Sequence, residues 1–205
     1  MEELDSFMKR LASGSPAPGG GAASALVSTV GSALASMVAS LTIGKKGYEA
    51  EQQKMVEVQK NATEISEKLR KLMKDDEDAF NLIVAAWSLP KSTDSEKTKR
   101  KVEIEKASLV AISVPINIAR ESLKVLEFAA YLSEKGNKNA ITDSACSSEF
   151  ALAAIKGALF NARINLKSIS DAEKKTQLEM NIRLIMDTAN DLHRTAEKNV
   201  SKAMS

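Results

Sequence analysis

Apolar residues recur at spacings of three and four along most of this chain of 205 residues, which is the period of an α-helix. The longest such run lies between residues 48 and 88, which hold no Gly or Pro, and its apolar positions are Met55, Val58, Ala62, Ile65, Leu69, Leu72, Ala79, Phe80 and Ile83. Other runs predict helices over residues 3–12, from the capping residues 92–95 to Gly136, from about residue 143, and over residues 171–204. Pro115 either kinks or divides the second of these.

Residues 13–43 break this pattern, since they read SGSPAPGG followed by GAASALVSTVGSALASMVASLTI. Pro16 and Pro18 fix φ in the approach, and three glycines follow them, Gly19, Gly20 and Gly21. Glycines give the backbone conformations that are closed to other residues and allow close approach to a ligand or another chain. Free N–H groups at the start of the next helix favour an anionic or polar ligand.

Small residues dominate the helix that follows this glycine loop. Serine recurs every four residues, at Ser24, Ser28, Ser32, Ser36 and Ser40. An apolar stripe lies beside the serines, at Leu26, Val30, Leu34, Val38 and Leu41. Because small side chains allow short distances between helix axes, we expect a central helix surrounded by others.

The same segment has two other interpretations. Its 23 residues without a charge are long enough to span a bilayer, although five serines and two threonines make insertion marginal. A signal peptide is excluded by the acidic residues Glu2, Glu3 and Asp5 at the start and by the prolines where an apolar run should begin. We therefore expect no membrane partner.

Asp76 interrupts the apolar stripe of residues 48–88. It comes four residues after Leu72 and three before Ala79, so the helical period places its carboxylate on the face predicted to be buried. Its acidic neighbours at positions 75, 77 and 78 fall mainly on other faces. Burial of a carboxylate is costly unless the group is paired or protonated. Asp76 therefore either forms a buried ion pair with a cation from another helix or has a functional role.

Composition adds limits to this picture. Charged residues make up 27% of the chain and aromatic residues only 4%, which favours an all-α protein over a β-sandwich or barrel. A net charge of +2, with no aromatic residues among the lysines near residue 100, gives no reason to expect a nucleic acid partner. One cysteine and one histidine exclude a disulfide framework, make a structural zinc site improbable and fit the cytoplasm.

Several polar residues are further candidates. Thr142 or Asp143 can cap the helix that follows a second polar loop. Asn161 and Asn165 share one face of that otherwise apolar helix and need partners in the core or on a ligand. We expect His193 to be a surface residue and Cys146 to contribute to packing. The motifs GxxxxGK[ST], GxGxxG, HExxH and GxSxG are absent, which disfavours phosphoryl transfer, dinucleotide binding and triad hydrolysis.

Five segments taken together, SGSPAPGGGAASAL, DDEDAF with LPK, SVP, KGN with TD, and NARINL, resemble the cyclodeaminase domain of formiminotransferase-cyclodeaminase. Free-standing bacterial relatives described as methenyltetrahydrofolate cyclohydrolases share this pattern. The resemblance covers nearly the whole chain, and the glycine loop is its most specific part. It implies a single domain over residues 1–205, an up-and-down helical bundle that forms a homodimer, and a folate cleft that involves the glycine loop.

The resemblance also implies roles for individual residues. The catalytic aspartate of the family's D-x-x-A-F motif corresponds to Asp76. Lys45 and Lys46 match a basic pair that is placed to bind the glutamate carboxylates of folate, and Asp143 matches a polar site position. We also expect substrate binding by the loop and the two amides, that is, by Pro18, Gly19, Gly20, Gly21, Asn161 and Asn165. The chain departs from the family at Arg163, where an apolar residue is more usual.

The expected reaction is cyclodeamination of a formiminotetrahydrofolate, with or without a polyglutamate tail, to 5,10-methenyltetrahydrofolate and ammonia. The folate is the substrate, and neither a metal nor another cofactor is expected. Hydrolysis of 5,10-methenyltetrahydrofolate on the same site is an alternative that no residue distinguishes. A non-catalytic helical module that dimerises through the small-residue helix is a third possibility.

Overall fold

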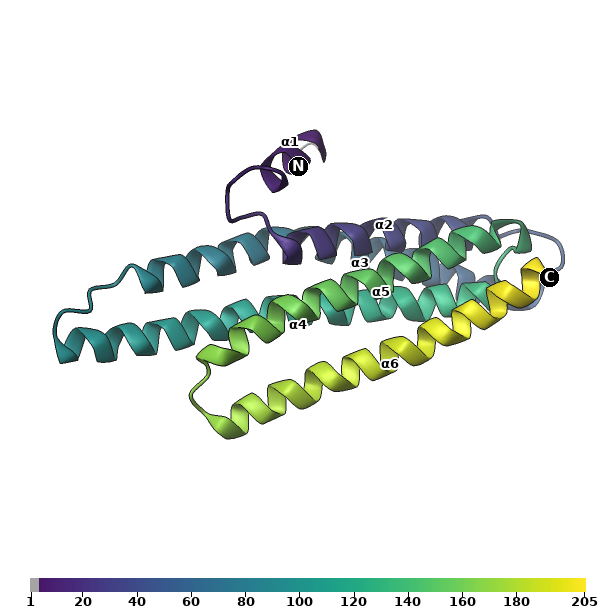
Figure 1. Ribbon diagram of the computed structural model, residues 1–205. Helices are drawn as coiled ribbons and strands as arrows, with labels where there is room; N and C mark the ends of the chain where they lie inside the picture. The colour runs from purple at the N-terminus through teal and green to yellow at the C-terminus, as the bar shows by residue number, and fades with distance from the viewer. Residues whose placement is uncertain (1–3) are drawn as a thin grey trace.

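The computed structural model describes residues 4–205, and every regular element in this range is helical (Figure 1). The absence of strands from this range confirms the predicted all-α fold. The predicted helix over residues 3–12 is present from residue 4, and residue 3 lies outside the described range. The α-helices are α1 (Leu4–Leu11), α2 (Gly20–Ser40), α3 (Gln52–Trp87), α4 (Asp94–Lys135), α5 (Ile141–Asn165) and α6 (Ala172–Met204). Three short 3₁₀ helices join them, η1 (Glu49–Glu51), η2 (Lys138–Ala140) and η3 (Leu166–Ser168).

The long helices run up and down, and α1 stands apart from them beside the start of α2 (Figure 1). Helices α2 to α5 pack on one another, and α6 lies against α4 and α5. The bundle has two ends. We call the end with residues 12–19, 88–93 and 166–171 the glycine-loop end, and the end with residues 41–51 and 136–140 the opposite end.

Small residues bring α2 close to both α3 and α5. The Ser32 hydroxyl donates to the Ala62 carbonyl of α3 at 2.7 Å, and the Ser147 hydroxyl of α5 donates to the Gly31 carbonyl at 2.8 Å. A Cβ added at Gly157 of α5 would lie 2.4 Å from the Ser24 hydroxyl oxygen. The predicted close approach of other helices is therefore confirmed.

The other face of α2 differs from the prediction. Ser24, Ser28 and Ser32 face the interior, whereas the larger apolar residues Val27, Val30, Met37 and Leu41 are exposed. The prediction that α2 is surrounded by other helices is therefore wrong within this chain. In the part of the chain that the structure describes, α2 is also the one helix that is long and apolar enough to cross a membrane, although over half of its apolar window is buried in the bundle.

Pro115 lies inside α4 and does not divide it, since the helix is continuous from Asp94 to Lys135. A proline has no N–H, so the carbonyl of Ala111, four residues earlier, loses its helical partner. The side-chain amide of Asn165 on α5 donates to this carbonyl at 3.3 Å. The proline thereby fixes Asn165 against α4.

Candidate active site

A cleft of about 340 Å³ opens at the glycine-loop end, between the loop and helices α3, α4 and α5. Its walls are largely apolar, and its polar side chains come from α3 and α5. The residues that line this cleft are Pro16, Ala17, Gly19, Gly20, Asp76, Ala79, Phe80, Ile83, Trp87, Ala111, Pro115, Asn161, Ile164 and Asn165. The structure thus brings together Asp76, two of the loop glycines and both candidate asparagines.

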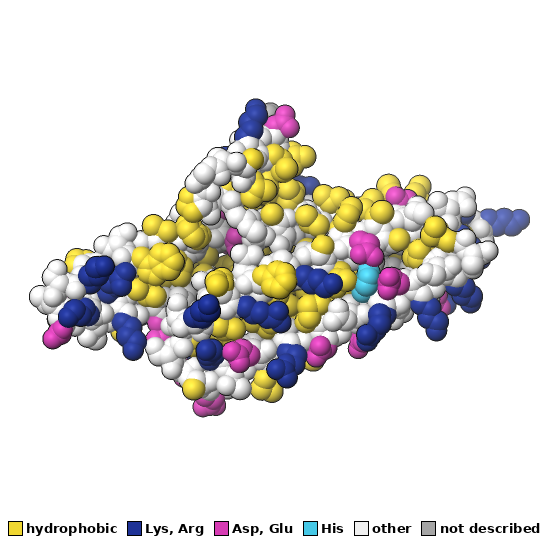
Figure 2. Space-filling model, viewed as in Figure 1, with side chains coloured by type: hydrophobic (Ala, Val, Ile, Leu, Met, Phe, Trp, Pro, Cys, Tyr) yellow, Lys and Arg dark blue, Asp and Glu magenta, His cyan; other side chains and the backbone are white. Residues whose placement is uncertain are grey.

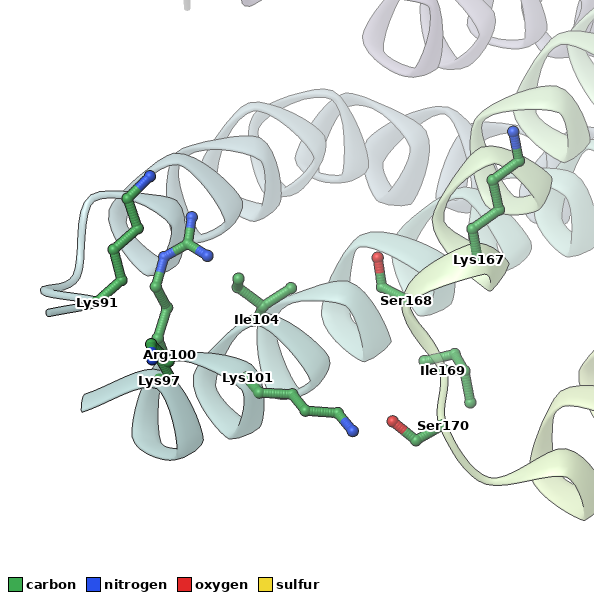
Figure 3. Close-up of a pocket in the computed structure, with 9 residues that line it drawn as sticks. All are labelled: Lys91, Lys97, Arg100, Lys101, Ile104, Lys167, Ser168, Ile169 and Ser170. Atoms are coloured by element: carbon green, nitrogen blue, oxygen red, sulfur yellow. The ribbon is translucent and has the colours of Figure 1, made fainter. Parts of the chain in front are cut away.

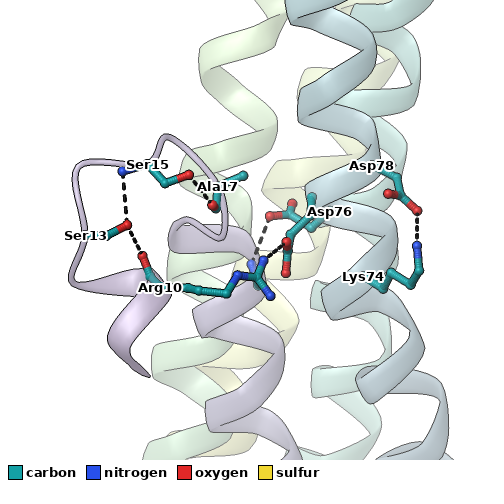
Figure 4. Close-up of polar contacts among 9 residues, drawn as sticks. Arg10, Ser13, Ser15, Ala17, Lys74, Asp76 and Asp78 are labelled. Carbon is teal, nitrogen blue, oxygen red and sulfur yellow. Dashed lines mark hydrogen bonds and ion pairs between the residues drawn. The ribbon is translucent and has the colours of Figure 1, made fainter. Parts of the chain in front are cut away.

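Asp76 lies where α3 passes the start of α2. Its Oδ2 accepts a hydrogen bond from the backbone N–H of Ala22 at 2.9 Å, the contact drawn beside Asp76 in Figure 4. Within residues 4–205 it forms no ion pair with a lysine or arginine. Burial raises the pKa of the Asp76 carboxyl above its usual value, the bond from Ala22 opposes this, and the nearby Glu77 charge adds to the rise. The ion-pair interpretation of Asp76 is therefore wrong.

The backbone of the glycine loop lies so close to this carboxylate that a side chain on Gly21 would not fit. A Cβ at Gly21 would lie 2.1 Å from Asp76 Oδ1, and a Cβ at Gly20 would lie 3.1 Å from Asn161 Nδ2. Neither of these glycines nor Gly19 has a positive φ, since only Gly44 and Gly47 do in the described range. The loop therefore needs glycine for close approach to Asp76 and Asn161, and the expected unusual backbone conformation is absent.

Polar contacts order the segment between α1 and α2, and one of them joins α1 to α3 (Figure 4). The Ser13 hydroxyl donates to the Arg10 carbonyl at 2.7 Å, and the Ser15 amide donates to the Ser13 hydroxyl at 3.1 Å. The Arg10 side chain forms an ion pair with Glu77, the residue after Asp76. Helix α1 is thereby tied to the segment of α3 that carries Asp76.

The start of α2 already has an anion, and this anion is Asp76 itself. The third residue of the helix, Ala22, donates to it, and the partial positive charge of the helix N-terminus stabilises the carboxylate. The amides of Gly20 and Gly21 precede it and belong to the first turn, whose N–H groups have no helical acceptor. The predicted anionic group at this helix end is therefore supplied by the protein.

The two asparagines present free acceptors to the cleft. Asn161 Nδ2 donates to the Gly157 carbonyl at 2.9 Å, and Asn165 Nδ2 donates to the carbonyls of Asn161 at 3.0 Å and Ala111 at 3.3 Å. The Oδ1 atoms of both have no hydrogen-bond donor within the described chain. These two oxygens can accept N–H groups of a ligand.

The apolar wall includes residues that the sequence interpretation missed. Trp87 has 54% of its surface exposed and lines the cleft with Ile164, which is 60% exposed. Trp87 is eleven residues after Asp76, and Phe80 and Ile83 are four and seven residues after it, so all share one face of α3. This spacing was the signal that could have identified them.

Other predicted site residues lie elsewhere. Lys45 and Lys46 follow the far end of α2, which rises about 30 Å from Gly20 to Ser40, and Asp143 is about 27 Å along α5 from Asn161. Lys45 Nζ donates to Asn137 Oδ1 at 2.7 Å. Asp143 lies in the first turn of α5, which has no side-chain cap, so the predicted cap by Asp143 or Thr142 is wrong.

Two of the loop residues also lie outside the cleft wall. Pro18, which follows a cis bond from Ala17, is buried and does not line the cleft. Gly21 is buried behind the wall against Asp76. Only Gly19 and Gly20 of the predicted loop residues therefore face the cavity.

His193 is not the surface residue that we expected. Its side chain is 14% exposed, with Nδ1 3.0 Å from the Ser148 hydroxyl and Nε2 3.4 Å from Glu149 and 4.0 Å from Glu197. The two carboxylates and the ring nitrogen lie within 4.8 Å of one another, close enough to share a cation, but Glu149 is about 18 Å along α5 from Asn161. Cys146 is exposed, so its predicted packing role is also wrong within the chain.

Known proteins similar to this chain share its fold and sequence pattern. The family model described as formiminotransferase-cyclodeaminase matches residues 3–184. A methenyltetrahydrofolate cyclohydrolase from Methylorubrum extorquens is 36% identical over 170 residues, which cover 83% of this chain and 82% of the relative. A formimidoyltransferase-cyclodeaminase from Gallus gallus is 30% identical over 91% of this chain, which spans only 34% of that protein.

A solved structure extends this similarity to three dimensions. The crystal structure of a formiminotetrahydrofolate cyclodeaminase from Thermotoga maritima superposes with a TM-score of 0.91. It is 28% identical in sequence, and the match covers 100% of this chain and 98% of that chain. The sequence match and the shared fold agree, and the chain belongs to the formiminotransferase-cyclodeaminase family.

Proposed function

We propose that this chain is a formiminotetrahydrofolate cyclodeaminase, an enzyme of folate one-carbon chemistry. The observation that carries the proposal is Asp76, a carboxyl group of raised pKa in a largely apolar cleft, which forms no ion pair within residues 4–205. The reacting group of the substrate is cationic, and so is the methenyl product. A partly desolvated carboxylate is suited to stabilise both.

In the proposed reaction the side-arm nitrogen of the folate attacks the formimino carbon, and a new C–N bond forms. Asp76 accepts the proton that this nitrogen loses and delivers it to the amino nitrogen of the former formimino group. The bond from carbon to that nitrogen then breaks, ammonia leaves, and the methenyl cation remains. The raised pKa suits Asp76 to this exchange, because a group that titrates nearer neutral pH takes up and releases a proton readily.

The rest of the cleft supplies binding groups for the pterin and the side arm. The free Oδ1 atoms of Asn161 and Asn165 are placed to accept N–H groups of the folate. Trp87 and Phe80 offer apolar faces to a flat ring. The backbone amide of Gly20, which lines the cleft, is a donor for a ring oxygen or nitrogen.

The test is turnover by Asp76→Asn, measured as ammonia released from formiminotetrahydrofolate. We expect a loss of at least about 10²-fold in kcat, the usual cost of removing a general acid–base group. Asp78→Asn is the matched control, because Asp78 is exposed and pairs only with Lys74 on the surface. Activity of Asp76→Asn within about threefold of wild type would contradict the catalytic role.

A cyclohydrolase activity on the same site is the second candidate, favoured by the Methylorubrum relative of matching length. In that reaction water attacks the methenyl carbon, and the ring opens to 10-formyltetrahydrofolate. Both substrates should be offered to the same preparation. Ammonia release from the formimino compound identifies the cyclodeaminase, and loss of the methenyl absorbance without ammonia identifies the cyclohydrolase.

Trp87 provides a direct test of folate binding. It lines the cleft and is the one tryptophan of the chain, so its fluorescence reports occupancy of this site. We expect saturable quenching by tetrahydrofolate. A flat titration together with no turnover would favour the non-catalytic helical module.

We further propose that two copies of the chain associate through the exposed face of α2. One apolar stripe with spacings of three or four is formed by Val27, Val30, Leu34, Met37 and Leu41, of which Leu34 is half-buried and the others are exposed. Half-buried Leu26 lies beside this stripe. Figure 2 has hydrophobic side chains along the upper edge of the molecule, where α2 runs. A symmetric dimer is the commonest way to bury such a face.

A further inference from the structure

The one histidine of the chain meets two carboxylates where α6 lies against α5. Glu149 comes from α5, and His193 and Glu197 lie one turn apart on α6. In Figure 2 the cyan histidine reaches the surface with acidic side chains beside it. Among the residues that the structure describes, this is the one group of three or more histidine, cysteine and acidic side chains whose ligand atoms lie close enough together to hold a metal ion.

The separations within this group fit metal coordination better than direct hydrogen bonding. His193 Nε2 lies 3.4 Å from Glu149 Oε1 and 4.0 Å from Glu197 Oε2. An N–H donor and its oxygen acceptor are usually about 2.7–3.2 Å apart, so both separations are too long for a good hydrogen bond. Two ligand atoms that are each about 2.0–2.1 Å from one tetrahedral Zn²⁺ are about 3.3–3.4 Å from each other. Small movements of the side chains therefore place all three atoms around one ion.

Ser148 orients the histidine ring from the protein interior. Its hydroxyl oxygen lies 3.0 Å from His193 Nδ1, and the residue is buried. When this hydroxyl accepts a hydrogen bond from Nδ1–H, Nε2 has no proton and its lone pair is available on the side of the two carboxylates. Metal-binding histidines almost always donate their second ring N–H in this way.

No lysine or arginine neutralises the two carboxylates. Within residues 4–205, the one ion-pair partner of Glu149 and of Glu197 is His193. Arg194, which is next to His193 in sequence, pairs with Asp191 instead. The two negative charges are therefore available to a cation from solution.

A group of basic side chains lies far from this place, at the glycine-loop end. Figure 3 shows the cavity of about 590 Å³ that is lined by Lys91, Lys97, Arg100, Lys101 and Lys167. Glu149 is about 24 Å along α5 from Asn165, which precedes Lys167, so salt screens these charges from the carboxylates. A cation is therefore favoured between α5 and α6 and not at the glycine-loop end.

We propose that Glu149, His193 and Glu197 bind one divalent transition-metal ion of the Zn²⁺ class, which joins α6 to α5. An imidazole nitrogen favours such an ion over Mg²⁺ or Ca²⁺, which prefer oxygen ligands. The two carboxylates balance the charge of the ion and supply the ligands that a chain with one histidine and one cysteine otherwise lacks. Three protein ligands leave the fourth tetrahedral position to water.

The ion forms a crosslink where α6 is weakly held. The large side chains that α6 buries fully, Ile182 and Ile185, lie in its first half, and beyond them only Ala189 and Ala196 are buried. Small side chains bury little apolar area, so the second half of α6 gains little free energy from packing. Binding of the ion therefore stabilises this half of the helix against local opening.

Calorimetric titration of the untagged, metal-free chain with ZnCl₂ tests the site. We expect one ion per chain, bound at least about tenfold more weakly by Glu149→Gln/Glu197→Gln, because two of the three ligands lose their charge. Glu127→Gln/Glu179→Gln is the matched control, since it removes the same charge from exposed residues of α4 and α6 outside the group. Absence of binding by wild type, or equally tight binding of Mg²⁺, would overturn the proposal.

Two further variants test where the ion binds. Ser148→Ala keeps all three ligands and releases the ring, so we expect it to bind Zn²⁺ about tenfold more weakly. Cys146→Ser removes the exposed thiol that lies one turn before Glu149 on α5, and it should bind Zn²⁺ as wild type does. Loss of binding in Cys146→Ser would assign the ion to the thiol and refute the three-residue site.

Hydrogen exchange tests the crosslink between the helices. At free Zn²⁺ of about ten times Kd, exchange of the amides of residues 190–204 that open locally should slow about tenfold in wild type. The same concentration should slow it at most about twofold in Glu149→Gln/Glu197→Gln. Equally fast exchange in wild type with and without the ion would show that the ion does not hold α6 and would contradict the inference.

Discussion

Asp76 accepts a hydrogen bond from a backbone amide and, among the described residues, pairs with no cation, so its burial is only partly compensated. The raised pKa means that, between the ordinary value of 3.8 and the folded value, the native chain binds more protons than the unfolded chain. The free energy of unfolding therefore falls as pH rises through this window. The charged carboxylate that the proposed chemistry needs therefore lowers the free energy of unfolding.

We accordingly expect Asp76→Asn to raise the melting temperature at pH 7 while it lowers activity. The amide keeps an oxygen that can accept from Ala22 and removes the desolvated charge. The difference between the two proteins should shrink as pH is lowered toward 4. Thermal unfolding from pH 4 to 8 checks this, and a gap that widens on acidification would contradict the assigned sign.

Gly21 is the loop position that should tolerate a side chain least. A methyl group there would meet the Asp76 carboxylate at 2.1 Å, so Gly21→Ala must displace either the loop or Asp76. We expect a destabilisation of about 1–3 kcal/mol, measured by urea unfolding, and at least about a tenfold loss of kcat. Gly14→Ala is the control, because nothing lies within 4 Å of its added Cβ.

At the scale of the helices, the proline in α4 and the amide on α5 form a unit. Asn165→Ala leaves the Ala111 carbonyl without a donor and should cost about 1–3 kcal/mol. The amide that Pro115→Ala introduces can bond this carbonyl within α4, so Asn165→Ala should cost less in that background. A double-mutant cycle in urea should give a coupling of about 1 kcal/mol, and additive effects would exclude the interpretation.

Helical period identified most of the elements, because each long helix has a regular apolar face. It also placed Asp76 correctly, since a carboxylate within a buried stripe lies at an interior position whatever the helix packs against. It could not say which end of the bundle a residue occupies. Lys45 and Asp143 fit the family pattern and yet lie at the opposite end from Asp76, because distance along a helix is not encoded in a motif.

The sequence also could not predict which residues of different helices contact one another. The sequence shows Glu197 four residues after His193, but Glu149 and Ser148 come from α5 and meet His193 only in the bundle. Likewise, Ser24, Ser28 and Ser32 of α2 face inward because α3 and α5 approach closely there, and the period alone cannot tell which of two stripes is buried.

For the whole molecule, the exposed stripe of α2 predicts a dimer in solution. Met37→Glu places a charge in this stripe and should convert a particle with the mass of two chains into one with the mass of a single chain. Met180→Glu on α6 is the matched control, because Met180 is exposed away from α2. Light scattering after size exclusion measures both, and a wild-type monomer would refute the proposed interface.

The three loop glycines have different surroundings, so their positions should tolerate substitution to different degrees during evolution. Position 19 has only an ordinary contact, 3.6 Å from the Pro16 carbonyl, so descendants of this chain can accept a small side chain there. A side chain at position 20 would require Asn161 to shift, so substitutions at these two positions, which are far apart in the sequence, should be correlated. Position 21 has no room beside Asp76, so lineages that keep the carboxylate are expected to keep this glycine, and lineages that lose one are free to lose the other.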